Sequence, residues 1–436
     1  MSSEGKLSQD LIERIIDLLS DDYKTLRKCA LVCADWRTRS QYLLFKYLEL
    51  VFVDSSESYV QNDSISQNRD RKGEKFDGFI HRLQTTILAN PSIVDKVRDL
   101  LVEFKPKMTR RSVEEFGVDA EMPLTLPFTK LESLYMRYSE GFGDYHFQIH
   151  RIKRLSLFLQ SNPSLRRIVI DPIALNESSV EFLTALQSLP DLQDLAWDGA
   201  WTSANGLCPI LPLKRLCWYS HVPSSDLGSD LVKLPQLEEL VILYSSRHLR
   251  AEATRVLRAC TASLKHLTIL LEEFIRCPTD ILTQMIHLTH LQLLDPCCQM
   301  LQVRLAGNCP LGYKISELSS LHSLLIVFPP EIQTILTRPA PSWADRALST
   351  VPEIAVYVWD IDNISGRVQI DLETLKLVFP LTSQLGLLKD MRPFWWPSTF
   401  WNKITDRAAL LSLLLQYVPH GGDYDGDTAH IVWMEM

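Results

Sequence analysis

Apolar residues recur along most of the chain in one triplet, in which the first is followed by others three and five positions later. The triplets begin at Val97, Leu131, Leu165, Leu192, Leu213, Leu237, Leu264, Leu288 and Leu321, with weaker copies at Val351 and Leu372. The last two members are two positions apart, the spacing of side chains on one face of a β-strand. Each triplet therefore predicts a short β-strand with its apolar face towards a shared core. One such unit cannot bury its apolar face alone, and the units are therefore expected to stack.

Helical segments precede several of the predicted strands, at Ser178–Leu189, Ala251–Cys260 and Thr279–Ile286. The triplets start about 21 to 34 residues apart, a spacing similar to that of leucine-rich repeats. Those repeats often carry Asn after the third leucine, which this chain lacks, and inserts near 137–153 and 295–313 break the period. We therefore expect an α/β fold with an irregular solenoid over residues 97–377.

Residues 7–45 show a different pattern, that of three short helices. The first has a wide apolar stripe at helical spacing, formed by Leu7, Leu11, Ile12, Ile15, Ile16, Leu18 and Leu19. Ser8 is placed to cap its start. The second helix carries Leu26, Leu31 and Val32, and the third carries Trp36, Leu44 and Phe45. Helices this short cannot bury all of these groups among themselves. The remaining apolar face meets either the rest of this chain or a partner.

The segments on either side of the repeats have their own patterns. Residues 48–53 alternate as a strand does, 55–75 are polar and predict a mobile loop, and 76–88 form an amphipathic helix that ends at Asn90-Pro91. Beyond residue 378 the triplet is lost, and aromatic residues gather at 393–401. A cap over the last repeat would bury such residues, so we expect 378–436 to be a C-terminal cap.

Charge and cysteine content limit the compartment and the partners. The net charge of −8 argues against a general nucleic-acid binder. No apolar run reaches the roughly 18–20 residues that cross a bilayer, and the N-terminus lacks a signal-peptide pattern. The nine cysteines are odd in number and scattered. They predict reduced thiols in a cytoplasmic or nuclear protein.

No catalytic or metal-binding motif is evident. Cys29 and Cys33 lie four apart, and His287, His290, Cys297 and Cys298 cluster, but the paired spacing of zinc ligands is missing. Nucleophile elbows, phosphate loops and dinucleotide fingerprints are absent from the sequence as well. We expect neither a cofactor nor a catalytic residue, although an enzyme without a known motif stays open as a third interpretation.

The outward positions of the repeat strands form the candidate target-binding surface. Three rows run across the predicted sheet: Asp194, Arg215, Glu239, His266 and His290; then Ala196, Cys217, Val241, Thr268 and Gln292; then Asp198, Tyr219, Leu243, Leu270 and Leu294. A mixed polar row beside an apolar row is typical of a protein-binding surface. Alternatively, Leu243, Leu270 and Leu294 are covered by inserts or by the cap.

The N-terminal helices resemble an F-box. The residues that carry the resemblance are Leu7-Ser8, Leu11-Ile12, Ile15-Ile16, Leu26, Ala30-Leu31-Val32-Cys33-Ala34-Asp35-Trp36-Arg37 and Leu44-Phe45. The chain departs from the family at Ser8, where most members have Pro, and at Tyr23-Lys24-Thr25-Leu26, where many have an Asp-Leu pair. The irregular repeats that follow resemble those found behind fungal F-boxes.

The resemblance implies a docking surface for the Skp-type linker of a cullin–RING ubiquitin ligase, with residues 1–50 as the F-box domain and 51–96 as a connecting segment. Linker binding is then expected at Leu7, Ser8, Leu11, Ile12, Ile15, Leu26, Leu31, Val32 and Trp36. The chain would be a non-catalytic substrate receptor whose repeats bind an unknown target protein. The alternative is a leucine-rich-repeat scaffold not linked to ubiquitination, whose N-terminal helices only cap the first repeat.

Overall fold

The computed structural model describes residues 8–19, 22–52, 85, 91–104, 124, 126–138, 147–148, 152–174, 179–198, 210–220, 233–244, 250–294, 310–328, 345–346, 348–358, 368–369, 376 and 380–388. The chain divides into two units. The first comprises residues 1–267 and 278–288, and the second comprises 268–277 and 289–436.

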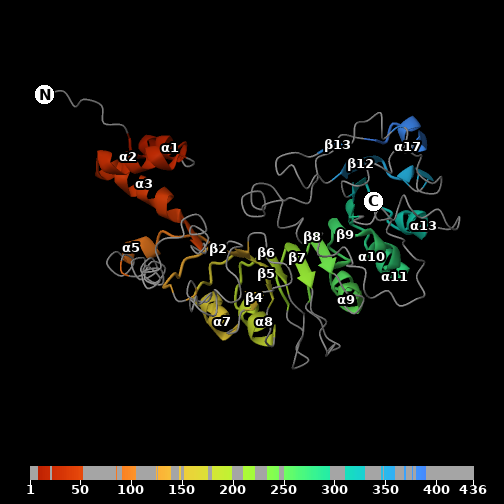
Figure 1. The fold of residues 1–436 in the computed structure, drawn as a ribbon, viewed down its shortest axis with the longest axis horizontal. Helices are drawn as coiled ribbons and strands as arrows, with labels where there is room; N and C mark the ends of the chain where they lie inside the picture. Colours follow the sequence, from red (N-terminus) through yellow and green to blue (C-terminus); the bar gives the residue numbers. More distant parts are fainter. Residues whose placement is uncertain are drawn as a thin grey trace, which may run out of the picture. The chain divides into compact units, whose positions relative to one another are not determined.

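Three helices open the first unit: α1 (Gln9–Asp17), α2 (Tyr23–Val32) and α3 (Ala34–Lys46). Figure 1 shows them packed together near the N-terminus, with α3 in contact with both α1 and α2. The first two helices are capped at their N-termini by side chains. The Ser8 hydroxyl accepts a hydrogen bond from Leu11 N (3.4 Å), and the Asp22 carboxylate accepts one from Thr25 N (3.0 Å). These caps satisfy backbone N–H groups that have no partner within the helix.

The first unit continues as a parallel sheet. Its strands are β1 (Tyr47–Phe52), β2 (Asp99–Phe104), β3 (Ser133–Tyr138), β4 (Phe147–Gln148), β5 (Arg167–Ala174), β6 (Asp194–Asp198), β7 (Arg215–Ser220) and β8 (Glu239–Tyr244). They lie in the order β1-β2-β3-β5-β6-β7-β8, and β4 pairs with β5. Each neighbouring pair is parallel, and the first residues of adjacent strands from β1 to β8 are paired in register.

Helices precede several of these strands. They are α5 (Pro91–Val94), α7 (Ile152–Gln160), α8 (Ser179–Gln187), α9 (Arg250–Cys260) and α11 (Thr279–Leu282). Figure 1 shows α7 and α8 side by side along one flank of the strands. The predicted helices at 178–189 and 251–260 are confirmed. The one at 279–286 is shorter, because a turn at Met285–Leu288 takes over before the next strand.

The second unit has the same construction. Strand β9 (His266–Leu270) spans the division, and β10 (His290–Leu294), β11 (Ser323–Phe328) and β12 (Glu353–Val358) follow as parallel neighbours. The short β13 (Val368–Gln369) pairs antiparallel with β12. Its helices are α10 (Leu271–Arg276), α13 (Pro310–Ser316) and α17 (Pro380–Gln384).

The apolar triplets account for the core. Each triplet from Val97 to Val351 has its last two members in a strand from β2 to β12, and its first member is buried just before that strand. The side chain of Trp197, a third member, lies outside the described residues. A six-residue unit of this kind places two side chains on one face of the strand and buries a third just before it, which is why the sequence pattern located the strands so closely.

Other predicted elements differ or cannot be compared. The strand predicted at 48–53 is β1, and it pairs with β2 over six positions, so the sheet begins within residues 1–50 and β1 ends in the segment assigned to the connection. The predicted helix at 76–88, apart from Thr85, the triplet at Leu372, apart from Lys376, and the cap from 389 onwards lie outside the described residues.

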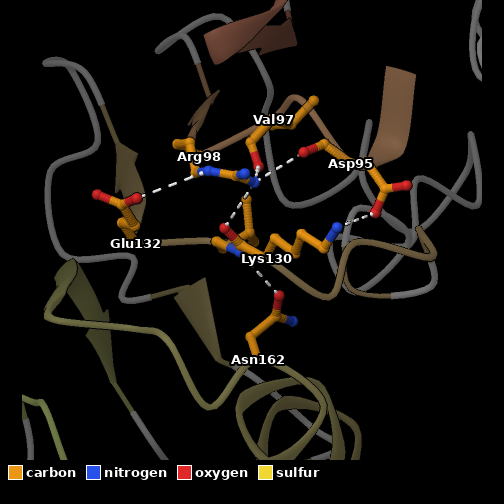
Figure 2. A network of polar contacts seen from close by, with 7 residues as sticks. Asp95, Val97, Arg98, Lys130, Glu132 and Asn162 are labelled. Carbon is orange, nitrogen blue, oxygen red and sulfur yellow. Dashed lines mark hydrogen bonds and ion pairs between the residues drawn. The ribbon is translucent and has the colours of Figure 1, made fainter. Parts of the chain in front are cut away.

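A polar network ties the first repeats together (Figure 2). The Arg98 guanidinium donates to the carbonyl oxygens of Asp95 (2.8 Å) and Lys130 (3.3 Å) and lies 3.6 Å from the Glu132 carboxylate. Asn162 is fully buried and accepts a hydrogen bond from Leu131 N at 3.2 Å. Because these contacts join turns that precede different strands, they fix the spacing between successive repeats.

Candidate interaction surfaces

Helix α1 carries two apolar stripes rather than one. Ile12, Ile16 and Leu19 share one face, where Ile12 and Ile16 are buried and Leu19 is partly buried. A second stripe of Leu11, Ile15 and Leu18 lies beside the first at the same spacing. Leu11 is 44% exposed and Leu18 is 87% exposed. Helix α1 is therefore apolar on the side that faces solvent as well as on the side that faces the core.

The buried stripe belongs to a closed three-helix core. Ile12, Ile16 and Leu26 form its centre, and partly buried apolar side chains complete it: Leu19, Trp36, Leu43 and Leu44. Arg39 of α3 ties the outside of this bundle to Asp17 of α1 by two hydrogen bonds of 2.7 and 2.8 Å. Ile12 and Leu26 thus support the predicted docking face from within and are not exposed to a partner.

Two further apolar side chains are exposed at the end of α2. Leu31 is 81% exposed and Val32 is 64% exposed. The Gln9 amide donates to the backbone oxygen of Asp35 (3.5 Å), which places the start of α1 at the α2–α3 junction. Leu11 lies in the first turn of α1 and Leu31 in the last turn of α2, so both belong to the same end of the bundle. Leu18 follows the last residue of α1, at the other end of that helix. We use the name apolar docking face for the exposed large apolar side chains of the bundle, which are Leu11, Leu18, Leu31 and Val32.

The remaining predicted linker contacts are distributed around this face. Ser8 is exposed and caps α1, which supplies a defined helix start. Ile15 and Trp36 are partly buried, and Trp36 packs on the three-helix core. Leu7 lies outside the described residues. The sequence did not distinguish the two stripes of α1, because side chains only 100° apart on a helix belong to one continuous apolar arc.

The three helices join the sheet without intervening residues. Helix α3 ends at Lys46 and β1 begins at Tyr47. Arg98 N donates to the Lys46 backbone oxygen at 2.9 Å, and the Lys96 ammonium donates to the Gln41 side-chain oxygen at 3.2 Å. The helical bundle is therefore held to the first repeat by hydrogen bonds that Gln41 and Lys46 of α3 accept.

On the sheet of the first unit, the first predicted row is a ladder of alternating charge. The Asp194 carboxylate is almost completely buried and accepts two hydrogen bonds from the Arg215 guanidinium, at 2.5 and 2.6 Å. Arg167 approaches Asp194 from the other side at 3.7 Å, and Glu239 follows Arg215 in register. His266 lies 3.9 Å from Glu239. Arg215, Glu239 and His266 are partly exposed.

Burial and neighbouring charges set the protonation of this ladder. Burial raises the pKa of Glu239, and the positive charge of Arg215 only partly offsets that rise. Burial alone would lower the pKa of Arg215, but its hydrogen bonds to Asp194 and the charge of that carboxylate outweigh the burial, so the Arg215 pKa is raised. Arg215 is therefore held as a cation, whereas ionised Glu239 is comparatively destabilised.

The second and third rows are much less accessible than the first. Ala196, Cys217, Thr268 and Gln292 are buried, and Val241 is partly buried. In the third row Leu294 is 1% exposed and Leu270 is partly buried. The side chains of Asp198, Tyr219 and Leu243 lie outside the described residues. The sequence left open whether the leucines of the third row are exposed or covered by other segments, and Leu294 is covered.

The first row continues in the second unit at His290. Its Nδ1 lies 2.8 Å from the Thr289 hydroxyl. Burial and the nearby His322 lower the pKa of His290, against an opposing effect of Glu353. His290 is partly exposed and is held mainly in its neutral form near neutral pH. The accessible part of the predicted target surface is thus the first row, at the beginning of each strand.

The described ranges hold neither a metal-binding cluster nor a membrane-spanning helix. No three His, Cys, Asp or Glu side chains there gather closely enough to bind a metal ion. Nor does any helix of those ranges combine the length and apolarity needed to cross a bilayer.

Comparison with known proteins gives little further guidance. No protein-family model matches the sequence. No curated protein matches it either. Among solved structures, a crystal structure of the leucine-rich repeat-containing protein LegL7 from Legionella pneumophila is similar over 65% of this chain and 98% of that chain. The sequence identity is 13% and the TM-score is 0.34, which is too low to assign the fold or the function of this chain.

Proposed function

We propose that this chain is a substrate-recognition subunit of a cullin–RING ubiquitin ligase, with the N-terminal helices docking on a Skp-type linker. The observation that carries the proposal is the apolar docking face. Leu11, Leu18, Leu31 and Val32 remain exposed although the bundle already has its own closed core. A cluster of large apolar side chains left in water is a mark of a protein-binding surface.

The form of this face suits a helix-in-groove contact. Leu11 and Leu18 lie two turns apart on α1, and Leu31 projects from the end of α2. Side chains at this spacing insert as separate anchors into an apolar groove of a helical partner. The resemblance of residues 7–45 to an F-box supports a Skp-type linker as that partner, and a cullin would join through the linker.

The repeat sheet would bind the target protein. Its accessible first row, with Arg215, Glu239 and His266 in the first unit, offers charged and polar contacts. Recruitment needs no catalytic group on this chain, because holding a target beside a ubiquitin-loaded enzyme raises the effective concentration of its lysines. We therefore propose a non-catalytic role.

Binding of the purified chain to a purified Skp-type linker tests the docking step. Leu11→Asp/Leu31→Asp places two carboxylates on the apolar docking face and should weaken binding by about 30-fold or more. Leu157→Asp/Ile286→Asp is a matched control, because both side chains are 55% exposed and lie on the repeats. The control should bind as tightly as the unchanged chain. Equal binding by both double variants would refute the assignment of the docking face.

A repeat scaffold unconnected to ubiquitination is the second candidate. The contacts of Gln41 with Lys96 and of Lys46 with Arg98 favour it, because they attach the helices to the first repeat. A well-folded chain that does not bind the linker at all would support this candidate. Co-purification with both linker and cullin would refute it.

A further inference from the structure

The exposed face of α2 combines positive charge with the apolar docking face. Lys24, Arg27, Lys28 and Leu31 occupy the positions i, i+3, i+4 and i+7 of one helical face, and all four are exposed. The opposite face carries Leu26 and Cys29, which are buried. The three cations therefore lie on the same face of α2 as Leu31, which is followed by the exposed Val32.

The stability of the helix does not explain these cations. Lys24 lies in the first turn of α2, where the helix dipole disfavours positive charge. Lys24 and Lys28 are also a like-charge pair at i, i+4, which destabilises a helix. Helix α2 contains no acidic residue of its own, and within the described residues neither Lys24 nor Arg27 forms an ion pair. An arrangement that opposes local stability points to a role outside the helix.

The local charge also contrasts with that of the whole chain. Residues 22–46 hold six basic residues, Lys24, Arg27, Lys28, Arg37, Arg39 and Lys46, against two acidic ones, Asp22 and Asp35. Six minus two leaves a charge of +4 in a chain whose net charge is −8. An acidic partner would therefore be repelled by the chain as a whole and attracted to this segment.

We infer that the partner of the docking face has carboxylates along the border of its apolar groove, and that Lys24, Arg27 and Lys28 steer its approach. This inference rests on the docking role proposed above. The cations flank the apolar anchors and are accessible, so they act mainly during the encounter and should govern the association rate more than the dissociation rate. An anionic membrane would attract three cations only weakly, because the net charge of the chain is −8. A groove on a protein is therefore the better fit as the partner.

Association kinetics with the purified Skp-type linker test the inference. Lys24→Glu/Arg27→Glu/Lys28→Glu reverses the charged face. The control Lys153→Glu/Arg166→Glu/Lys214→Glu makes the same change in net charge on exposed positions of the repeats. Glutamate at position 24 is favoured by the helix dipole, and glutamate has a helix propensity similar to that of lysine and arginine, so the first variant should retain its melting temperature. At low ionic strength it should associate about tenfold or more slowly, with a nearly unchanged dissociation rate, and the control should behave like the unchanged chain.

Ionic strength and vesicles separate the outcomes. Added salt should slow association of the unchanged chain and should speed association of the α2 variant, whose glutamates are repelled by the carboxylates of the partner. Equal association rates for all three proteins would overturn the inference while the docking role stands, whereas absence of any linker binding would overturn both. Co-sedimentation of the unchanged chain with phosphatidylserine vesicles, lost in the α2 variant, would also overturn it in favour of a lipid surface.

Discussion

Asn162→Ala tests how the repeats are joined. The Asn162 side chain is fully buried, and it accepts from Leu131 N (3.2 Å) while its amide donates to the backbone oxygen of Phe158 (2.9 Å). After the substitution, Phe158 O still accepts from the Ser161 hydroxyl at 2.8 Å. The buried Leu131 N–H, in contrast, keeps no partner among the described residues. An unpaired buried donor costs about 1–3 kcal/mol, and the lost hydrogen bond to Phe158 adds about 1 kcal/mol.

The expected loss is therefore about 2–4 kcal/mol in the free energy of opening the first repeats. Hydrogen–deuterium exchange of a peptide covering 126–138 measures this loss locally, and the exchange should become roughly 30- to 1,000-fold faster. Asn162→Leu should stay destabilised although other repeats carry an apolar residue at this position, such as Leu189 and Leu234, because Leu131 N–H would still be unpaired. Gln160→Ala, at an exposed position nearby, should change stability by less than about 0.5 kcal/mol.

Two results would contradict this reasoning. Unchanged exchange in Asn162→Ala would mean that the Leu131 N–H finds another partner or water. Full stability in Asn162→Leu would mean that filling the space matters more than the hydrogen bond. In either case the polar network of Figure 2 would not set the repeat spacing.

Three further predictions concern single groups. The Asp345 carboxylate accepts hydrogen bonds from the backbone N–H groups of Leu381 and Thr382 in the first turn of α17. Asp345→Ala should therefore lower the free energy of unfolding by about 1–2 kcal/mol and speed hydrogen exchange over residues 380–388. Unchanged exchange would contradict this prediction. Burial raises the pKa of the Cys260 thiol to about 12, whereas Cys33 is exposed. Iodoacetamide at neutral pH should therefore alkylate Cys33 in the folded chain and should modify Cys260 only after unfolding. Because the pKa of Glu239 is raised in the fold, the folded chain binds the proton more tightly, and this group's contribution to stability falls as pH rises from its unfolded value through its folded one. Glu239→Gln should therefore gain stability relative to the unchanged chain, in urea titrations, as pH rises above the ordinary glutamate pKa of about 4. A stability difference independent of pH would contradict the assignment.

The sequence predicted the local elements better than their long-range contacts. The triplet spacing located β2, β3 and the strands from β5 to β12, because the alternation of side chains along a strand is a local property, but it did not locate β4, which lies in the stretch treated as an insert. It could not show that Tyr47–Phe52 pairs with β2, since a parallel partner many residues away leaves no local signal. Nor could it show that Leu294 is covered, because an outward position looks the same in sequence whether or not another segment packs on it.

The candidate docking site shows the same division. Both stripes of α1 satisfy the helical spacing, and only packing against α2 and α3 decides that Ile12 is inside and Leu11 outside. Two of the predicted linker contacts, Ile12 and Leu26, are buried in the structure. The sequence could not show this, because helical spacing alone does not separate inward from outward apolar positions. The charge of α2 was visible in the sequence, but its meaning depended on knowing that Lys24, Arg27, Lys28 and Leu31 share one exposed face.

The charge ladder also bears on how the repeats find their correct neighbours during folding. Near-identical apolar triplets would let one strand dock beside the wrong repeat, with a comparable gain in buried area. Along the ladder the sign alternates from Arg167 through Asp194 and Arg215 to Glu239. If β6 were omitted from the order, Arg167 would lie beside Arg215, and if β7 were omitted, Asp194 would lie beside Glu239. Like charges on adjacent strands are destabilising, so the ladder selects against skipped repeats and against strand exchange between chains.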